Sequence, residues 1–430
     1  MAKMEGGTEA RLAVLSLNVS ATLRRSSYQI FCRPTGIHSG SWLEGTGDHK
    51  DLRLALLLRK MESLDLVLLQ EMFEASPFRH RQFLKEARAL GFKYHCGSVW
   101  PRLLSPQLMD GGLLILSRYP IVERDQLSFS LGSGSDGVCA KGAIYARVQL
   151  SPDLADSLHV FTTHTQASDS FSGSEIRANQ LAELLAFIER STRDDPASPV
   201  LIGGDFNMDA RHDLSHENGQ VHSTPCKQSR VYEQFMSGLS RALPGRAVVD
   251  LLKTHGRDPT QSGANIHPIT NGDGHAALVH TRDPADLTKD GKCIDYLFFR
   301  PGEDAAEDAS AFSLELAPSK TRVDYCQVAD IVPVRNGGRL PVTHLSDHYG
   351  LRAEFTVQTS EEVTRPDGSP LDSGAMLADA LQLYFPPHAF AQTPRRLWRL
   401  KLLLALLAIA ATSSAAVVIV MQTLYTALRR

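Results

Sequence analysis

The sequence has no cysteine pattern of the kind that holds a zinc ion or a disulfide framework. Its six cysteines show no Cys-x-x-Cys pair and no regular spacing: Cys32, Cys96, Cys139, Cys226, Cys293 and Cys326. Scattered cysteines in a sequence of globular composition are typically buried thiols. We therefore expect all six to be reduced core residues.

Two further features are missing. The first 14 residues, MAKMEGGTEARLAV, contain no apolar stretch of the kind found in a secretory signal. Basic residues are not in excess either, because 45 Lys and Arg stand against 48 Asp and Glu, for a net charge of −3. A protein that wraps nucleic acid normally carries a basic surface. No nucleic-acid partner is expected.

A long hydrophobic run occurs only near the C-terminal end, where residues 402–421 contain no charge. A helix of this length can cross a hydrocarbon core of about 30 Å, and Trp398 and Tyr425 stand where an aromatic belt would be. Four basic residues precede the run and two follow it: Arg395, Arg396, Arg399, Lys401, then Arg429 and Arg430. This bias predicts a single-pass, tail-anchor-like protein with its large domain in the cytosol, and the endoplasmic reticulum is the favoured membrane.

The body of the chain predicts one folded domain over 1–357, and overall 43% of residues are hydrophobic. Residues 358–394 are rich in Thr, Ser, Glu, Pro and Asp and predict a linker. Within this linker, 374–385 is either a short amphipathic helix or part of a disordered tether. Residues 395–430 form the membrane segment.

Short apolar strands alternate with amphipathic helices, which predicts a mixed α/β fold of two packed sheets flanked by helices. The expected helices are 50–63, 76–90 and 174–192. The expected strands are 11–18, 65–71, 112–117, 142–150, 158–166, 200–207, 293–300 and 349–357. Segments 112–117, 142–150 and 158–166 follow one another without a helix, so we expect them to be antiparallel neighbours. Stretches 208–230 and 257–290 are predicted surface insertions. The loop 98–112 is either folded over the core or dips into a membrane interface.

Polar side chains recur at or beside the ends of these strands. They are Asn18, Glu71, His164, Asp205, Asn207, Asp295, Asp347 and His348. Each has a local explanation as a turn former, a cap or an ion-pair partner, but eight at so many strand ends favour a shared site.

The chemistry of this set is that of phosphate-ester hydrolysis. Oxygen ligands from Glu71 and Asn18 suit Mg²⁺, and Mn²⁺ is also possible. A His beside a carboxylate can activate water, and a second His with an Asn can donate to phosphoryl oxygens. Together they predict metal-assisted hydrolysis, in which Asp205 and Asn207 of "GGDFNMD" face the attacked phosphorus.

Five motifs occur in an order that resembles one family: "LQEMF", "THTQA", "GGDFNMD", "IDYLFF" and "LSDHYG". The chain is similar over about 11–357 to the endonuclease/exonuclease/phosphatase superfamily and, within it, to the neutral Mg²⁺-dependent sphingomyelinases. This resemblance implies a two-sheet α/β sandwich. It also implies that Glu71 is the main metal ligand with Asn18 beside it and Asp347 close to the metal.

The same resemblance assigns the remaining roles. His348 is the general base and Asp295 orients it, His164 and Asn207 stabilise the phosphate, and Asp205 positions the water or phosphate. Asp136 and Lys141, in "SDGVCAKGAIYARV", resemble an Asp–Lys pair of the sphingomyelinases. The alternative for that segment is a surface loop with ordinary charges.

Three features favour the sphingomyelinases over other members of the superfamily. The Asp136–Lys141 segment is sphingomyelinase-like, a Cys-Asp-Arg motif of inositol phosphatases is replaced by "IDYLFF", and a membrane segment suits a substrate that resides in a bilayer. The expected reaction is hydrolysis of sphingomyelin to ceramide and phosphocholine by direct attack of water on phosphorus. The alternatives are a lysophospholipid or inositol phosphosphingolipid phosphodiesterase, a metal-dependent nuclease, and an inactive tethered scaffold.

Overall fold

The computed structural model describes residues 10–19, 50–74, 77–98, 101, 107, 109–134, 136–150, 157–255, 266–271, 291–303, 313–316, 320–332 and 342–358. Most of the loop 98–112, most of the insertion 257–290, the linker beyond 358 and the segment 395–430 lie outside these residues. Within the described ranges, no helix is long and apolar enough to cross a membrane.

The first sheet contains seven of the described strands. Its order is β13-β15-β1-β2-β4-β3, and β14 also pairs with β15. The strands are β1 (Ala10–Asn18), β2 (Leu66–Gln70), β3 (Tyr94–Gly97), β4 (Leu114–Ser117), β13 (Ser313–Leu316), β14 (Arg322–Asp324) and β15 (Gly350–Gln358). Strands β1 and β2 run parallel, and β15 pairs antiparallel with β1. The carboxyl ends of β1 and β2 therefore meet the start of β15 at one edge of the sandwich.

The second sheet contains six described strands in the order β11-β12-β8-β7-β6-β5. They are β5 (Ile121–Ser128), β6 (Gly142–Gln149), β7 (Ser157–His164), β8 (Val200–Asp205), β11 (Val249–Asp250) and β12 (Asp295–Arg300). Strands β7, β8 and β12 are buried along their whole length. Because both of their faces are covered, β8 and β12 are nearly continuous apolar runs at their centres. Strand β7 instead buries polar residues, among them His159, Thr162 and Thr163.

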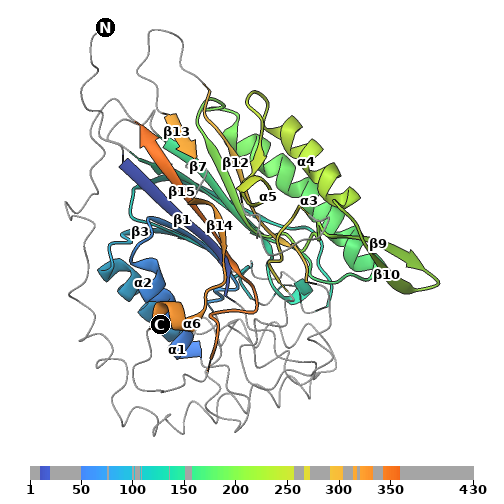
Figure 1. Ribbon diagram of the computed structural model, residues 1–430, viewed down its shortest axis with the longest axis horizontal. Coiled ribbons are helices and arrows are strands. Elements are labelled where there is room, and N and C mark those ends of the chain that lie inside the picture. Colours follow the sequence, from blue (N-terminus) through green and yellow to red (C-terminus); the bar gives the residue numbers. More distant parts are fainter. Residues whose placement is uncertain are drawn as a thin grey trace, which may run out of the picture.

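The two sheets pack face to face, and helices cover their outer faces (Figure 1). In β1, Leu12 and Val14 point into the core between the sheets, whereas Ala13, Leu15 and Leu17 point to a second core under the helices. This alternation is the two-residue period of a strand with both faces buried. The helices on that side are α1 (Lys50–Met61), α2 (Pro77–Ala89) and α6 (Val328–Ile331).

Two long helices cover the other sheet, α3 (Phe171–Thr192) and α4 (Arg230–Ala242). Helix α3 begins three residues before the predicted position because the Ser170 side chain caps it by accepting from the Gly173 amide. Helix α4 was not predicted, although Ser229 caps it and Tyr232, Phe235 and Leu239 recur on its buried face. A short helix, α5 (Leu251–His255), follows β11.

The predicted two-sheet α/β sandwich is confirmed, with two corrections to its details. Segment 112–117 is not a neighbour of 142–150, because β4 pairs with β2 and β3 in the other sheet. Strand β5 pairs with β6 instead. It was not predicted, because it is exposed and contains few apolar residues. The insertion 208–230 contains a hairpin, β9 (His212–Glu217) and β10 (Gln220–Pro225), which projects beside the start of α3 (Figure 1).

The reduced state predicted for the cysteines is confirmed for five of the six. Cys96, Cys139, Cys226, Cys293 and Cys326 are free thiols. Three of them, Cys96, Cys293 and Cys326, are buried, which agrees with a role as small core residues. Cys139 and Cys226 are half-buried instead. Cys32 lies outside the described residues.

Candidate active site

Residues from both sheets meet at one end of the sandwich. Strand pairing in the second sheet places His164 opposite Asp205, and Asp205 opposite Asp295, so that three neighbouring strands contribute a row of titratable side chains. In the first sheet Asn18 ends β1 and Glu71 directly follows β2. The Asn18 side chain contacts both Glu71 and Asp205, so it joins the two rows at this end of the sandwich.

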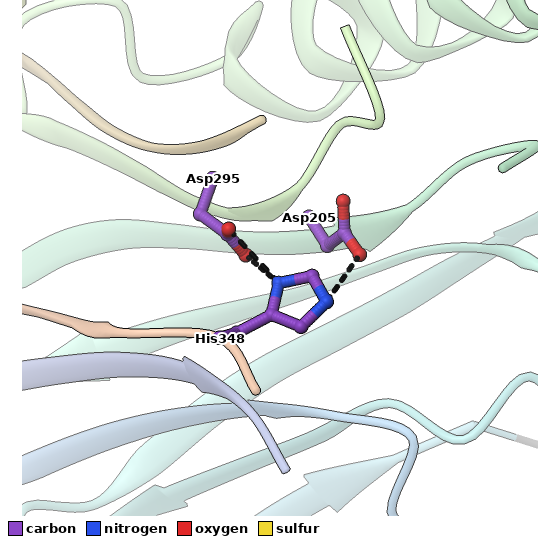
Figure 2. Close-up of side chains that lie close together, drawn as sticks. All are labelled: Asp205, Asp295 and His348. Carbon is purple, nitrogen blue, oxygen red and sulfur yellow. Dashed lines mark hydrogen bonds and ion pairs between the residues drawn. The ribbon is translucent and has the colours of Figure 1, made fainter. Parts of the chain in front are cut away.

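His348 lies between two buried carboxylates (Figure 2). Its Nδ1 is 3.1 and 3.0 Å from the two carboxylate oxygens of Asp295, and its Nε2 is 3.9 Å from Asp205 Oδ2. An ionised carboxylate can only accept hydrogen bonds, so Asp295 holds a proton on Nδ1. Nε2 of the neutral ring is then the atom that can accept a proton.

The carboxylates also set the proton affinity of this histidine. Burial alone would lower the pKa of His348, but the charges of Asp295, Asp205 and Asp347 and the hydrogen bond to Asp295 raise that pKa well above its usual value. A histidine held in one tautomer and made more basic is suited to take a proton from water.

Asp205 connects this pair to the first sheet. Its Oδ2 accepts from Asn18 Nδ2 at 2.9 Å, and its Oδ1 accepts from the Asn207 amide at 2.9 Å. Burial, followed by the charge of Asp295, raises the pKa of Asp205 to about 6. Two carboxyl groups this close disfavour simultaneous ionisation unless positive charge is present.

Glu71 and Asn18 offer oxygen ligands beside Asp205. Asn18 Nδ2 lies 3.3 Å from Glu71 Oε1, so one amide group contacts both carboxylates. Glu71 has a left-handed backbone (φ 62°), which is uncommon for a residue with a side chain and frequent at functional sites. Hard carboxylate and amide oxygens, surrounded by an excess of acidic groups, fit a divalent cation such as Mg²⁺.

A second set of groups is also close enough to bind a cation. Potential ligand atoms of Asp205, Asp295 and His348 all lie within 4.8 Å of one another. However, both oxygens of Asp295 already contact His348 Nδ1. These contacts fit a proton-accepting unit, and the cation site predicted at Glu71 and Asn18 stays a prediction.

Lys141 and Asp136 form the ion pair that the sequence predicted. Lys141 Nζ lies 3.0 Å from Asp136 Oδ1, 2.9 Å from His164 Nε2 and 2.7 Å from the Thr165 carbonyl oxygen. Lys141 is buried, so the segment is not the surface loop of the alternative interpretation. Asp136 also accepts from the Ala167 amide at 2.7 Å, which ties the loop after β7 to this pair.

His164 is held neutral by these surroundings. Burial, then the charges of Lys141 and His348, lowers the pKa of His164 well below its usual value. An ammonium group has no acceptor, so His164 Nε2 accepts from Lys141 and the ring proton is on Nδ1. That Nδ1 has no hydrogen-bond partner among the described residues. His164 Nε2 also lies 3.4 Å from Asp205 Oδ2. The predicted role of His164 in stabilising the phosphate stays a prediction.

Asn207 lies on the same side as Lys141. It has a left-handed backbone (φ 45°), and its Nδ2 donates to the Thr165 carbonyl oxygen at 3.1 Å. The preceding glycines explain how β8 can end so close to β7. Gly204 has φ 149°, and a Cβ there would lie 2.3 Å from the Thr163 carbonyl oxygen, so no other residue fits without moving β7.

Asp347 is buried next to His348 and accepts from Ser346 Oγ at 3.4 Å. Its predicted place near the metal stays a prediction. The sequence did not single out Thr270, whose hydroxyl oxygen accepts from the amides of Ile294 and Asp295 at 3.0 and 3.1 Å. Thr270 stands in a segment far from both in the chain, so no local pattern pointed to it.

Asp110 was also missed. Its carboxylate accepts from the amides of Gly112 and Glu74, which fastens the turn that follows Glu71. Burial raises the pKa of Asp110 to about 7 despite these hydrogen bonds. A buried Asp that accepts from two backbone amides positions its neighbours, and the sequence "MDGG" shows only a turn signal.

A sequence model of the endonuclease/exonuclease/phosphatase family matches residues 15–348. A sphingomyelinase of Dictyostelium discoideum is 28% identical over an alignment of 339 residues, which covers 67% of this chain and 70% of that protein. Sphingomyelinase C of Bacillus cereus is 31% identical over 216 residues, covering 47% of this chain and 61% of that protein. Sphingomyelinase C from Streptomyces griseocarneus, a crystal structure, aligns with 80% of this chain and 99% of its own at 19% identity, with a TM-score of 0.49.

Proposed function

The chain belongs to the endonuclease/exonuclease/phosphatase family, and we propose that it is a Mg²⁺-dependent phosphodiesterase that hydrolyses sphingomyelin to ceramide and phosphocholine. Mn²⁺ is a possible substitute for Mg²⁺. The proposal is supported by similarity to sphingomyelinases of two organisms. It is also supported by a site whose residues match the requirements of phosphodiester hydrolysis.

The observation that carries the proposal is the position of His348 between Asp295 and Asp205. His348 Nε2 takes a proton from water as the water oxygen forms its bond to phosphorus. Asp295 keeps the imidazole in the tautomer that can do so and stabilises the imidazolium that results. A properly placed general base typically accelerates a reaction by about 10²–10⁴-fold.

The other half of the site stabilises the phosphate. Lys141 brings a buried positive charge that contacts His164, and Lys141 and Asn207 both donate to the Thr165 carbonyl oxygen. Fixed donors in a buried site stabilise charge that develops on the phosphoryl oxygens without reorganising. As the bond from phosphorus to the ceramide oxygen breaks, that oxygen leaves and takes up a proton from solvent water. The His348 imidazolium then releases its proton to solvent, which restores the base.

Glu71 and Asn18 would hold the divalent cation. When bound, such an ion offsets negative charge on the phosphoryl and leaving oxygens. The excess of carboxylates around Asp205 supports this assignment, because the pKa of Asp205 is raised to about 6 by burial and by Asp295. A cation beside it would favour the ionised form.

We also propose that residues 402–421 tether the enzyme to a membrane, with the domain on the cytosolic side. Support comes from the sequence, in which 20 residues carry no charge and basic residues precede them. A tether places the site next to a substrate that resides in the bilayer.

The test is a substrate panel assayed with the full chain in detergent micelles. Sphingomyelin, lyso-platelet-activating factor, an inositol phosphosphingolipid and supercoiled plasmid are each incubated with Mg²⁺ and with EDTA. We expect Mg²⁺-dependent release of phosphocholine from sphingomyelin at the highest kcat/KM. Faster turnover of one of the other two lipids would show that this lipid is the substrate and that the phosphodiesterase reaction is correct. Plasmid nicking without lipid hydrolysis would establish a nuclease.

A further inference from the structure

The candidate site has two halves on different elements. The phosphate half consists of Asp136, Lys141 and His164, together with the loop 165–170 that runs from β7 to α3. The base half consists of Asp295 and His348. Strand β8 lies between β7 and β12 in the sheet, so the distance between the halves is set partly by that strand. A second connection runs across the loop 165–170.

Asp169 is the centre of that connection. Its carboxylate accepts from Arg177 NH2 at 3.1 Å and also pairs with the ammonium group of Lys292. Its carbonyl oxygen interacts with His216 Nε2 of the β9–β10 hairpin at 2.8 Å. Asp169 therefore joins helix α3, the hairpin and the segment that leads into β12.

Hydrogen bonds hold the loop 165–170 to helix α3 and to Asp136. Arg177 is buried, and its NH1 donates to the carbonyl oxygens of Gln166 and Ser168 at 2.9 Å each. The Ala167 amide donates to Asp136 at 2.7 Å, and Asp136 pairs with Lys141. A displacement of Asp169 would therefore move the hydrogen-bonded loop and, through Asp136, Lys141.

Lys292 is attached to the base half in the same way. It lies three residues before Asp295, and its backbone forms a ladder with Asn271 through N–O distances of 2.8 and 3.1 Å. Asn271 also forms a bridge with His348, and its Nδ2 donates to the Asp347 carbonyl oxygen at 3.4 Å. Lys292 therefore stands on the segment that carries Asp295, and Asn271 joins this segment to the one that carries His348.

We propose that the Asp169–Lys292 ion pair is a positioning device that fixes the phosphate half of the site against the base half. This inference rests on the proposed function, because it concerns the same reaction. Neither residue touches the reacting atoms. The side chains are 29% and 39% exposed, so the pair contributes little to folding. Catalysis is far more sensitive, since a displacement of 1 Å can cost about 100-fold in rate.

A double-mutant cycle on the full chain tests the proposal. Asp169→Asn keeps an oxygen that can accept from Arg177 but removes the charge that faces Lys292, and Lys292→Met keeps the length of the side chain but removes the ammonium group. We expect each single variant to lose about tenfold in kcat on micellar sphingomyelin with less than about a twofold change in KM. The double variant should be no slower than either single variant. Lys292→Arg should retain at least about half of the wild-type kcat, because the cation is kept.

The control is an exposed ion pair that joins α3 to β5. Arg190 NH2 lies 3.1 Å from Asp125 on β5, and both side chains are about half exposed. The matching cycle, Asp125→Asn with Arg190→Met, should leave kcat within about twofold of wild type. Salt gives an independent readout: about 1 M NaCl, where the Debye length is about 3 Å, should slow the wild type and the control variants but not the Asp169 and Lys292 variants.

Two results would overturn the inference. One is multiplicative loss, in which the double variant falls by the product of the single losses and the residues act independently. The other is wild-type kcat in both single variants, whose thermal unfolding temperatures establish that they are folded. In either case wild-type hydrolysis of sphingomyelin would stand, whereas failure of the wild type to hydrolyse any lipid of the panel would refute the proposed function itself.

Discussion

Asp295 presents both of its carboxylate oxygens to His348 Nδ1, at 3.1 and 3.0 Å, although the two residues are 53 positions apart in the chain. The opposite ring nitrogen of His348 faces Asp205 at 3.9 Å. This arrangement leaves one nitrogen for proton transfer and uses the other for orientation. Its consequences are measurable.

Substitution of the pair should affect turnover in a graded way. His348→Ala removes the proton acceptor and should lower kcat by about 10²–10⁴-fold. Asp295→Asn leaves the imidazole in place but loses the charge that orients it, so kcat should fall by less than in His348→Ala. Steady-state assays with both variants check this. Equal, small effects would mean that another group accepts the proton.

The activity should rise with pH. His348 must be neutral to accept a proton. Burial lowers the pKa of His348, but the charge of Asp295 outweighs burial and raises that pKa well above its usual value. The acidic limb of the pH–rate profile should therefore lie above the ordinary pKa of a histidine, about 6.5. Protonation of Asp205, whose pKa is about 6, acts in the same direction at lower pH.

Asp295→Asn should move that acidic limb to lower pH, because removing the negative charge makes the imidazolium less stable. Profiles of kcat for the wild type and the variant, measured in one buffer series, test the sign. A wild-type profile that is flat from mildly acidic to neutral pH would contradict the role of His348.

Glu71→Gln should abolish most activity while the protein stays folded. A neutral amide is a poorer ligand for Mg²⁺ than a carboxylate, so cation affinity measured by calorimetry should fall by about tenfold or more. Excess Mg²⁺ should restore little activity. Full activity of the variant, or of the wild type in EDTA, would argue against a metal mechanism.

Lys141→Ala should strongly reduce sphingomyelin hydrolysis, because it removes a buried charge that contacts His164 and the Thr165 carbonyl oxygen. The matched control is Lys85→Ala, since Lys85 is an exposed residue of α2. Lys60 is a poor control because it pairs with Asp324 at 2.7 Å and is largely buried. Near-normal kinetics for Lys141→Ala would weaken the sphingomyelinase branch of the proposal specifically.

Removal of residues 395–430 should separate tethering from chemistry. The truncated protein should keep its activity on detergent-dispersed sphingomyelin but turn over vesicle substrate more slowly, because tethering raises the local concentration of substrate without altering the site. Protease added to intact membranes should digest the domain of the full chain. A protected domain would mean that the active site faces the lumen.

Much of the fold could be predicted from the sequence where the pattern was strong. The apolar runs of β2, β8 and β12 were placed within a few residues, because a strand buried on both faces has few polar positions. Strand β5 was missed because its exposed residues are mostly polar. The predicted pairing of 112–117 was wrong, because the local sequence of a strand does not determine which of the two sheets the strand joins.

The types of side chain in the site, their order along the chain and their places at strand ends were all determined by the sequence, because these depend on the local pattern alone. Their contacts depend on strand register and on the packing of one sheet against the other. Asn18 and Asp205 are 187 positions apart, yet their side chains meet at 2.9 Å. The hydroxyl of Thr270 and the Asp169–Lys292 pair likewise join segments distant in the chain. Only the tertiary structure decided those contacts, because hydrogen bonds and ion pairs form between groups that folding brings within a few ångströms of one another.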